Sequence, residues 1–226
     1  MSLLHLDSSA HRTSESVTRQ LTALFAHRWR ARHGDAGYRH RDLAGRPVAG
    51  IGEAYCELGR RVERCGLALA GPVDGLIETA AEQHEWDLTR PLVAELLRSE
   101  ILLVGAPMYN YSAPAALKAW IDRISFPGIF LDPVDGSSLL AGLRVIIVTA
   151  CGGSYRPATA AEERDFLRPY LRAYFARQGV PTGNIEIVTA DMTLAGIVPG
   201  RENLRPLAAD SLALARARLV DLAGSH

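Results

Sequence analysis

Residues 101–124 most constrain the fold, because within one loop the sequence changes from a buried strand to a helix. Residues 101–104 form an apolar run closed by Gly105 and Pro107, too short for a free-standing helix and typical of a strand buried on both faces. From Pro114 the apolar spacing becomes helical, with one face made by Leu117, Trp120, Ile121 and Ile124. Ligands of a parallel sheet bind just beyond the carboxyl ends of its strands. The loop of residues 107–113 is therefore expected to contact a flat, partly polar ligand.

The rest of the chain alternates strands with helices. Strands are predicted at residues 3–6, 38–43, 101–104, 143–149 and 185–190. Helices are predicted from Val17 and at 52–69, 73–98, 114–124, 166–175 and 204–222, with a break in the third near residues 87–91. The polar second strand suits a sheet edge. This alternation predicts an α/β fold: a five-stranded parallel sheet of order 2-1-3-4-5 with helices on both faces. No linker composition divides residues 1–226, so a single domain is expected.

Composition excludes several classes of function. The formal net charge is zero, which gives no reason to expect a nucleic acid or an acidic membrane as partner. No apolar stretch is long enough to span a bilayer, and the N-terminus does not resemble a signal peptide. The cysteines, Cys56, Cys65 and Cys151, lack a metal-ligand spacing. A cytoplasmic protein without a bound metal is expected.

Three loops are predicted to meet at one edge of the sheet: residues 8–16, 107–113 and 151–156. The first is rich in hydroxyl groups and leads into a helix N-terminus, which favours an anion site, although a well-capped helix with a solvated loop explains it equally well. The second contributes aromatic, thioether and amide groups, and the third a pair of glycines. Together they suit a flat heterocycle with a single phosphate, such as flavin mononucleotide (FMN), better than a nucleoside triphosphate.

Several motifs resemble those of the FMN-dependent NADH-azoreductases, which are also NAD(P)H:quinone oxidoreductases. The motifs are Pro-Met-Tyr-Asn-Tyr at 107–111, Leu-Lys-Ala-Trp-Ile-Asp-Arg at 117–123, the serines of 9–16, Arg-Asp-Leu at 41–43 and Gly-Gly at 152–153. The resemblance covers nearly the full length. It implies a flavodoxin-like fold, a homodimer with FMN at each end of its interface, NADH or NADPH as the reductant, and ping-pong hydride transfer to a quinone, azo compound or related aromatic acceptor.

The resemblance also implies a role for individual residues. Ser9, Ser14 and Ser16, with the backbone of Glu15, would hold the phosphate. Pro107, Met108, Tyr109, Asn110 and Tyr111 would lie along the flavin ring, and Ala150, Cys151, Gly152 and Gly153 would approach its pyrimidine end. At positions 150–153 the family commonly has Ser-Arg-Gly-Gly. This chain has Ala-Cys in place of Ser-Arg, so the loop lacks a hydroxyl and a cation. Phe126, Phe130 and Tyr155 would line the acceptor pocket, with Phe126 and Phe130 placed over the flavin from the partner subunit. No catalytic side chain is expected, because the flavin carries the redox chemistry.

Simpler interpretations remain beside these. Cys151 is interpreted as a small space-filling residue rather than a redox thiol, and His5 as a core residue. Phe126 and Phe130 otherwise cover a helix end. Lys118, Asp122 and Arg123 are expected on a solvated or dimer-facing side of their helix. The alternative functions are an electron carrier, a reductase of a biosynthetic pathway, and a binding module that has lost FMN.

Overall fold

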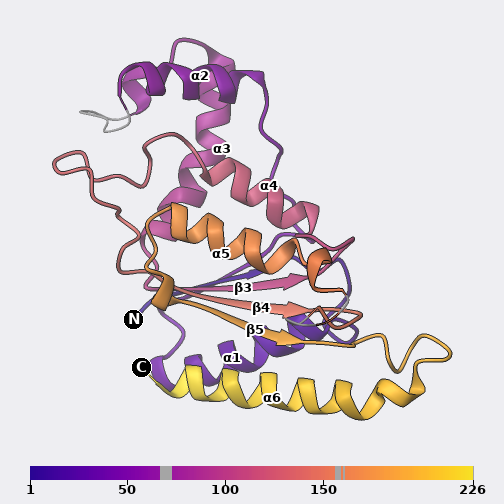
Figure 1. The fold of residues 1–226 in the computed structure, drawn as a ribbon. Coiled ribbons are helices and arrows are strands. Elements are labelled where there is room, and N and C mark those ends of the chain that lie inside the picture. Colours follow the sequence, from indigo (N-terminus) through magenta and orange to yellow (C-terminus); the bar gives the residue numbers. More distant parts are fainter. Residues whose placement is uncertain (67–72, 156–158, 160, 226) are drawn as a thin grey trace.

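The computed structural model describes residues 1–66, 73–155, 159 and 161–225 and shows a sheet between two layers of helices (Figure 1). The strands are β1 (Leu3–Asp7), β2 (Tyr38–Asp42), β3 (Ile101–Pro107), β4 (Arg144–Ala150) and β5 (Ile185–Ala190). The α-helices are α1 (Val17–His33), α2 (Glu53–Arg64), α3 (Ala80–Leu97), α4 (Ala115–Ile124), α5 (Leu167–Arg177) and α6 (Arg205–Gly224). All strand pairs are parallel, in the order β2-β1-β3-β4-β5, so the predicted topology is confirmed.

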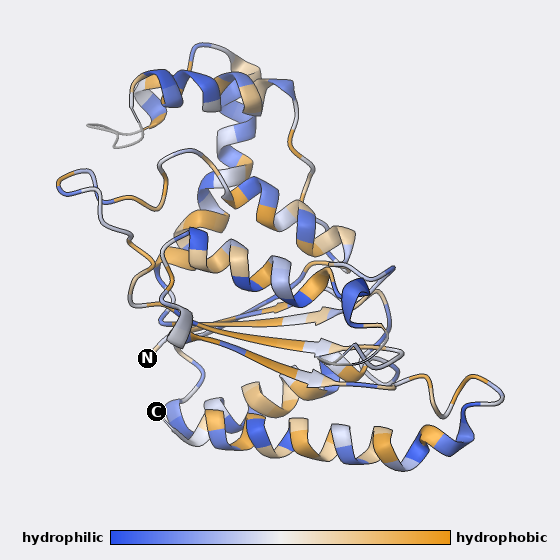
Figure 2. Cartoon of the chain, in the orientation of Figure 1, coloured by the Kyte–Doolittle hydropathy of each residue, from blue (hydrophilic) through white to orange (hydrophobic). Residues whose placement is uncertain are grey.

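The central strands are apolar because both of their faces are covered. In β3, Leu102 and Val104 contribute to the core beneath α3, α4 and α5, whereas Ile101 and Leu103 contribute to the core beneath α1 and α6. This alternation follows the two-residue period of a strand, and Figure 2 shows the strands as the most hydrophobic layer. Strand β2 lies at the edge of the sheet and is mostly polar, as expected.

The segment between β2 and β3 forms a projection above the sheet, made by α2 and the start of α3 (Figure 1). A small separate core holds it together, in which the Phe126 ring lies 5.3 Å from that of Tyr55 and 5.2 Å from that of Trp86. The predicted break near residues 87–91 is wrong. Helix α3 continues through Pro91, because burial of Leu92 and Val93 outweighs the single backbone hydrogen bond that proline removes.

The interruption lies instead before Thr79, which begins α3 with a capping box. Its hydroxyl accepts a hydrogen bond from the Glu82 N–H at 3.1 Å, and the Glu82 carboxylate accepts one from the Thr79 N–H at 3.2 Å. We expect Thr79→Ala to lower the free energy of unfolding by about 1 kcal/mol. Urea denaturation would measure the loss. Thr79→Ser should restore most of it, and an equal loss in both variants would contradict the capping role.

Arg123 does not face solvent, contrary to expectation. Its side chain is fully buried, donates to the backbone oxygens of Ala49 and Gly50, and forms an ion pair with Glu85 at 2.6 Å. These contacts tie the connection after β2 to α3 and α4. Lys118 and Asp122, on the same helix, are partly exposed and pair with each other. The sequence places Lys118, Asp122 and Arg123 on one polar side of α4. Helical spacing alone cannot show that another segment of the chain covers Arg123.

None of the helices in the part of the chain that the structure describes is long and apolar enough to cross a membrane. Cys56, Cys65 and Cys151 are free thiols.

Candidate functional site

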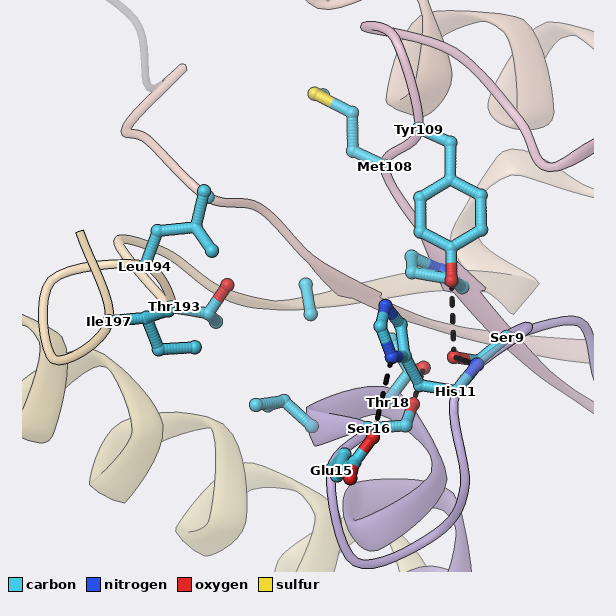
Figure 3. Close-up of a pocket in the computed structure, with 14 residues that line it drawn as sticks. Ser9, His11, Glu15, Ser16, Thr18, Met108, Tyr109, Thr193, Leu194 and Ile197 are labelled. Atoms are coloured by element: carbon cyan, nitrogen blue, oxygen red, sulfur yellow. Dashed lines mark hydrogen bonds and ion pairs between the residues drawn. The ribbon is translucent and has the colours of Figure 1, made fainter.

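A cavity of about 490 Å³ opens at the carboxyl ends of β1, β3 and β4, and this size is typical of small-molecule sites (Figure 3). Its walls come from the loops that follow these strands, from the start of α1 and from the loop after β5. The lining residues are Ser9, His11, Glu15, Ser16, Val17, Thr18, Pro107, Met108, Tyr109, Ala150, Gly152, Thr193, Leu194 and Ile197.

The first wall is the N-terminus of α1. Ser16 is the N-cap, and its hydroxyl accepts from the Arg19 N–H at 3.3 Å and lies 3.1 Å from the Thr18 hydroxyl. The first N–H groups of a helix have no partner within the helix, and the helix dipole places positive charge there. Hydroxyls and free amides therefore face the cavity together. This arrangement suits a phosphate group.

Arg19 holds the loop after β1 in place from behind. Its Nη2 donates to the Ser9 carbonyl oxygen at 2.7 Å and to Asp42 Oδ1 at 2.6 Å. The contact with Asp42 connects the loop to strand β2. Arg19 is itself nearly buried and does not line the cavity, so it positions Ser9 without presenting its charge to a ligand there.

The second wall is the loop after β3, which turns sharply. Tyr109 and Ser112 exchange two backbone hydrogen bonds of 3.0 Å, and the two residues between them have positive φ, 48° at Asn110 and 69° at Tyr111. Asparagine tolerates this conformation, but tyrosine rarely adopts it. The turn directs Asn110 and Tyr111 outward, where both are exposed, and leaves Met108 and Tyr109 on the cavity.

The Tyr109 hydroxyl connects the first two walls. It lies 3.3 Å from the Ser9 hydroxyl and accepts from the Ala10 N–H at 3.1 Å, and Figure 3 shows the ring spanning from one loop to the other. His11 and Glu15 also line the cavity, and His11 Nδ1 lies 3.6 Å from Glu15 Oε2. The hydroxyl-rich loop and the aromatic loop thus form one connected unit.

The third wall contains Ala150, Cys151 and Gly152. Ala150 and Gly152 line the cavity, whereas Cys151 is completely buried. Burial raises the pKa of the Cys151 thiol to about 12, so the thiol stays protonated and unreactive. A side chain at Gly152 would meet Leu194, whose Cδ1 lies 2.5 Å from the position that a Cβ would take. Glycine at this position allows the Leu194 side chain to pack directly against the backbone.

A fourth wall was not predicted. Thr193, Leu194 and Ile197 lie in the loop between β5 and α6, which extends away from the sheet (Figure 1) and faces Tyr109 across the cavity (Figure 3). The Thr193 N–H donates to the Cys151 carbonyl oxygen at 3.0 Å, which joins this loop to the third wall. This loop follows the carboxyl end of β5, and ligands bind at the carboxyl ends of parallel strands. Its position in the sequence was therefore a signal that could have identified it.

The model of a family described as having a flavodoxin-like fold matches residues 1–195. The chain belongs to this flavodoxin-like family.

One relative of this chain is an FMN-dependent NADH:quinone oxidoreductase of Nocardia farcinica. The two sequences are 39% identical over 193 residues, which cover 85% of this chain and 84% of that protein. One of the same name from Methylorubrum extorquens is 35% identical over 204 residues, 89% and 91% of the two chains.

Solved structures share the same fold. The crystal structure of an azoreductase from Bacillus anthracis has a TM-score of 0.81 at 16% identity, covering 100% of both chains. A Bacillus anthracis FMN-dependent NADH-azoreductase in complex with FMN has a TM-score of 0.77 at 18% identity, covering 99% of this chain and 98% of that one.

The cavity unites most of the residues predicted to hold FMN. Those on its walls are Ser9, Glu15, Ser16, Pro107, Met108, Tyr109, Ala150 and Gly152. Ser14, Asn110, Tyr111, Cys151 and Gly153 belong to the same loops but do not line the cavity in this structure.

The residues predicted for an acceptor pocket lie elsewhere. Phe126 and Phe130 are 3% and 4% exposed and belong to the core, because the turn after α4 folds both rings inward. Neither ring lines the cavity of its own chain, and their predicted place over the flavin of a partner subunit stays a prediction. Tyr155 packs edge-on against the exposed Tyr111, with ring centroids 6.1 Å apart, beside the cavity rather than on its wall.

Proposed function

We propose that this chain is an FMN-dependent oxidoreductase that uses NADH or NADPH to reduce quinones, azo compounds or related aromatic acceptors. The observation that carries the proposal is the single cavity joining an anion-binding helix N-terminus, an aromatic and thioether wall, and a glycine backbone. The names of the relatives, with identities of 35–39% over most of both chains, support this function.

The residues of the cavity fit each part of FMN. Ser9, Ser16 and the first amides of α1 would hold the phosphate, with Ser14 and the Glu15 backbone on the same loop. Met108 and Tyr109 would support the ring, with Asn110 and Tyr111 at the outer edge. At the pyrimidine end, the backbone from Ala150 to Gly153 would approach the ring, because Ala150 and Gly152 lie on the cavity wall.

When bound, FMN supplies the redox chemistry by accepting a hydride and passing it on. The protein residues would bind and orient it: hydroxyls and amides would hold the phosphate, while Met108, Leu194 and Ile197 would exclude water from the ring. Backbone N–H groups in the loops after β3 and β4 would stabilise negative charge on the ring. We assign no nucleophile or acid–base side chain, and the protonated Cys151 thiol takes no part.

We further propose that the enzyme is a cytoplasmic homodimer. Exposed aromatic side chains beside the cavity support an interface there: Tyr111 is 43% and Phe166 59% exposed, and Phe166 borders an apolar hollow with Pro169 and Tyr170. Analytical ultracentrifugation of wild type and of Phe166→Glu tests the interface. A monomeric wild type would contradict it.

The function is tested with the purified protein. We expect flavin absorbance at one FMN per chain, rapid bleaching by NADH under anaerobic conditions, and recovery of colour on adding a quinone. Steady-state rates with quinones and azo dyes, each with NADH and NADPH, then identify the preferred pair. A colourless protein that does not take up added FMN contradicts the proposal, and bleaching only by a reduced partner protein would indicate an electron carrier.

Tyr109→Phe tests the connection between the two loops. It retains the ring and removes the hydroxyl that contacts Ser9 and Ala10. We expect FMN affinity to fall about fivefold, corresponding to roughly 1 kcal/mol for one lost hydrogen-bonding group. Fluorescence titration of the apoprotein with FMN measures the change. Tyr174→Phe, which removes a hydroxyl that lies 2.9 Å from the Ser125 hydroxyl and outside the cavity, is the matched control. Equal affinities for the two variants would contradict the role of Tyr109.

A further inference from the structure

Two histidines face each other at the edge of the sheet, away from the walls of the cavity. His5 of β1 and His40 of β2 are direct partners in the parallel register, and their rings lie 4.6 Å apart. Asp7 follows His5 by two residues and therefore points to the same face of the sheet. Residues far apart in the sequence thus place two imidazoles and a carboxylate together.

The distances between their free atoms match those of metal ligands. Asp7 Oδ2 lies 3.0 Å from His40 Nε2 and 3.4 Å from His5 Nε2, and the three atoms lie within 4.8 Å of one another. Ligands about 2.0–2.1 Å from a tetrahedral zinc ion are separated by roughly 3.4 Å. Small side-chain shifts would therefore accommodate an ion.

The state of His5 points to a ligand. Its side chain is 4% exposed, and its Nε2 accepts or donates no hydrogen bond among the residues that the structure describes. The other ring nitrogen, Nδ1, lies 2.9 Å from the Tyr38 hydroxyl, the kind of outer contact that orients a metal-binding histidine.

Asp7 is also prepared as a ligand. Its Oδ1 accepts from the Thr22 hydroxyl at 2.9 Å, which leaves Oδ2 directed at the histidines.

Nearby charge does not exclude a cation. Arg19 Nη1 lies 3.7 Å from Asp7 Oδ2, but the Arg19 guanidinium also pairs with Asp42 at 2.6 Å. The carboxylates of Asp7 and Asp42 together outnumber the single Arg19 guanidinium by one negative charge. The His40 side chain is 38% exposed, which provides access from solvent.

We propose that His5, Asp7 and His40 bind one divalent transition-metal ion, with zinc as the best fit and a fourth position open to water. Two imidazoles and one carboxylate are a ligand set that zinc commonly has in proteins. The ion would link edge strand β2 to β1. The proposal does not depend on flavin binding, and its test is read from metal content rather than reductase activity.

The test uses the full FMN-loaded chain carrying Cys56→Ser and Cys65→Ser, because these exposed thiols otherwise bind zinc. After treatment with a chelator and dialysis against Zn²⁺, elemental analysis is expected to find one zinc ion per chain. Competition with a chromogenic chelator gives the affinity. His40→Ala, at a partly exposed position, should weaken binding at least 10-fold, about the loss that follows removal of even an outer contact.

Matched variants separate this site from nonspecific binding. His27→Ala removes an exposed histidine of α1 and should leave zinc affinity unchanged, and Tyr38→Phe should weaken it about 10-fold. Zinc should raise the thermal midpoint of the parent and of His27→Ala but not that of His40→Ala. No zinc retained by the parent, or equal affinity in the parent and in His40→Ala, would overturn the proposal and leave a hydrogen-bonded His–Asp–His group.

Discussion

Ser16→Asp is expected to weaken FMN binding about 100-fold while leaving the fold intact. Aspartate is as good an N-cap as serine, so helix α1 should retain its stability. The change places a negative charge beside the phosphate, against the first turn of α1. Two like charges about 4 Å apart near a protein surface repel by up to about 4 kcal/mol, and solvent reduces this to the roughly 2.7 kcal/mol that corresponds to 100-fold.

The measurement is a fluorescence titration of the apoprotein with FMN, accompanied by the thermal midpoint of each variant. Thr13→Asp is the matched control, because Thr13 lies in the same loop but lines the hollow on the other side of it, with Arg12 and Arg19. We expect that control to bind FMN within about twofold of wild type. Equal weakening by the two substitutions would show that the loop responds only to net charge and would contradict the phosphate position.

Arg123→Met is expected to destabilise the protein by about 3–5 kcal/mol, the typical cost of removing one partner from a buried ion pair. Methionine approximates the length of the arginine stem, so most of the loss comes from the groups left behind. Glu85 loses its 2.6 Å ion pair, and the Ala49 and Gly50 carbonyl oxygens lose their donors. Urea denaturation monitored by circular dichroism measures the free energy of unfolding.

Two comparisons isolate the cause. Arg216→Ala, on the exposed side of α6, should change stability by less than about 0.5 kcal/mol. The double variant Arg123→Met with Glu85→Gln should lose less than the sum of the single variants, because it leaves no unpaired charge. Strict additivity would mean that the backbone contacts alone account for the effect.

The fold was largely predictable because its signals are local. The apolar run of β3, the helical spacing of α4 and the polar character of edge strand β2 each lie within a few residues of sequence. The parallel direction of the strands then follows from their alternation with helices, and the structure confirms the predicted order. The error at Pro91 shows the limit, since tertiary burial of one face of α3 overrode a local helix breaker.

The candidate site was predictable only in part. Ser16, Met108 and Gly152 lie in loops that follow known strands, and the motifs of the family identify them. Leu194 and Ile197 carry no motif, and Phe126 gives the same sequence signal whether it lines a pocket or fills a core. That distinction depends on which segments pack above the ring.

The sequence by itself therefore determined the strand order, the position of the ligand-binding edge and the loops that form it, because these depend on local periodicity and on the connectivity of parallel sheets. Only the tertiary structure decided that Arg123 is buried against Ala49 and Gly50, that the loop after β5 completes the cavity, and that His5, Asp7 and His40 lie together. These contacts join residues many positions apart, and no short-range pattern encodes the side-chain packing that creates them.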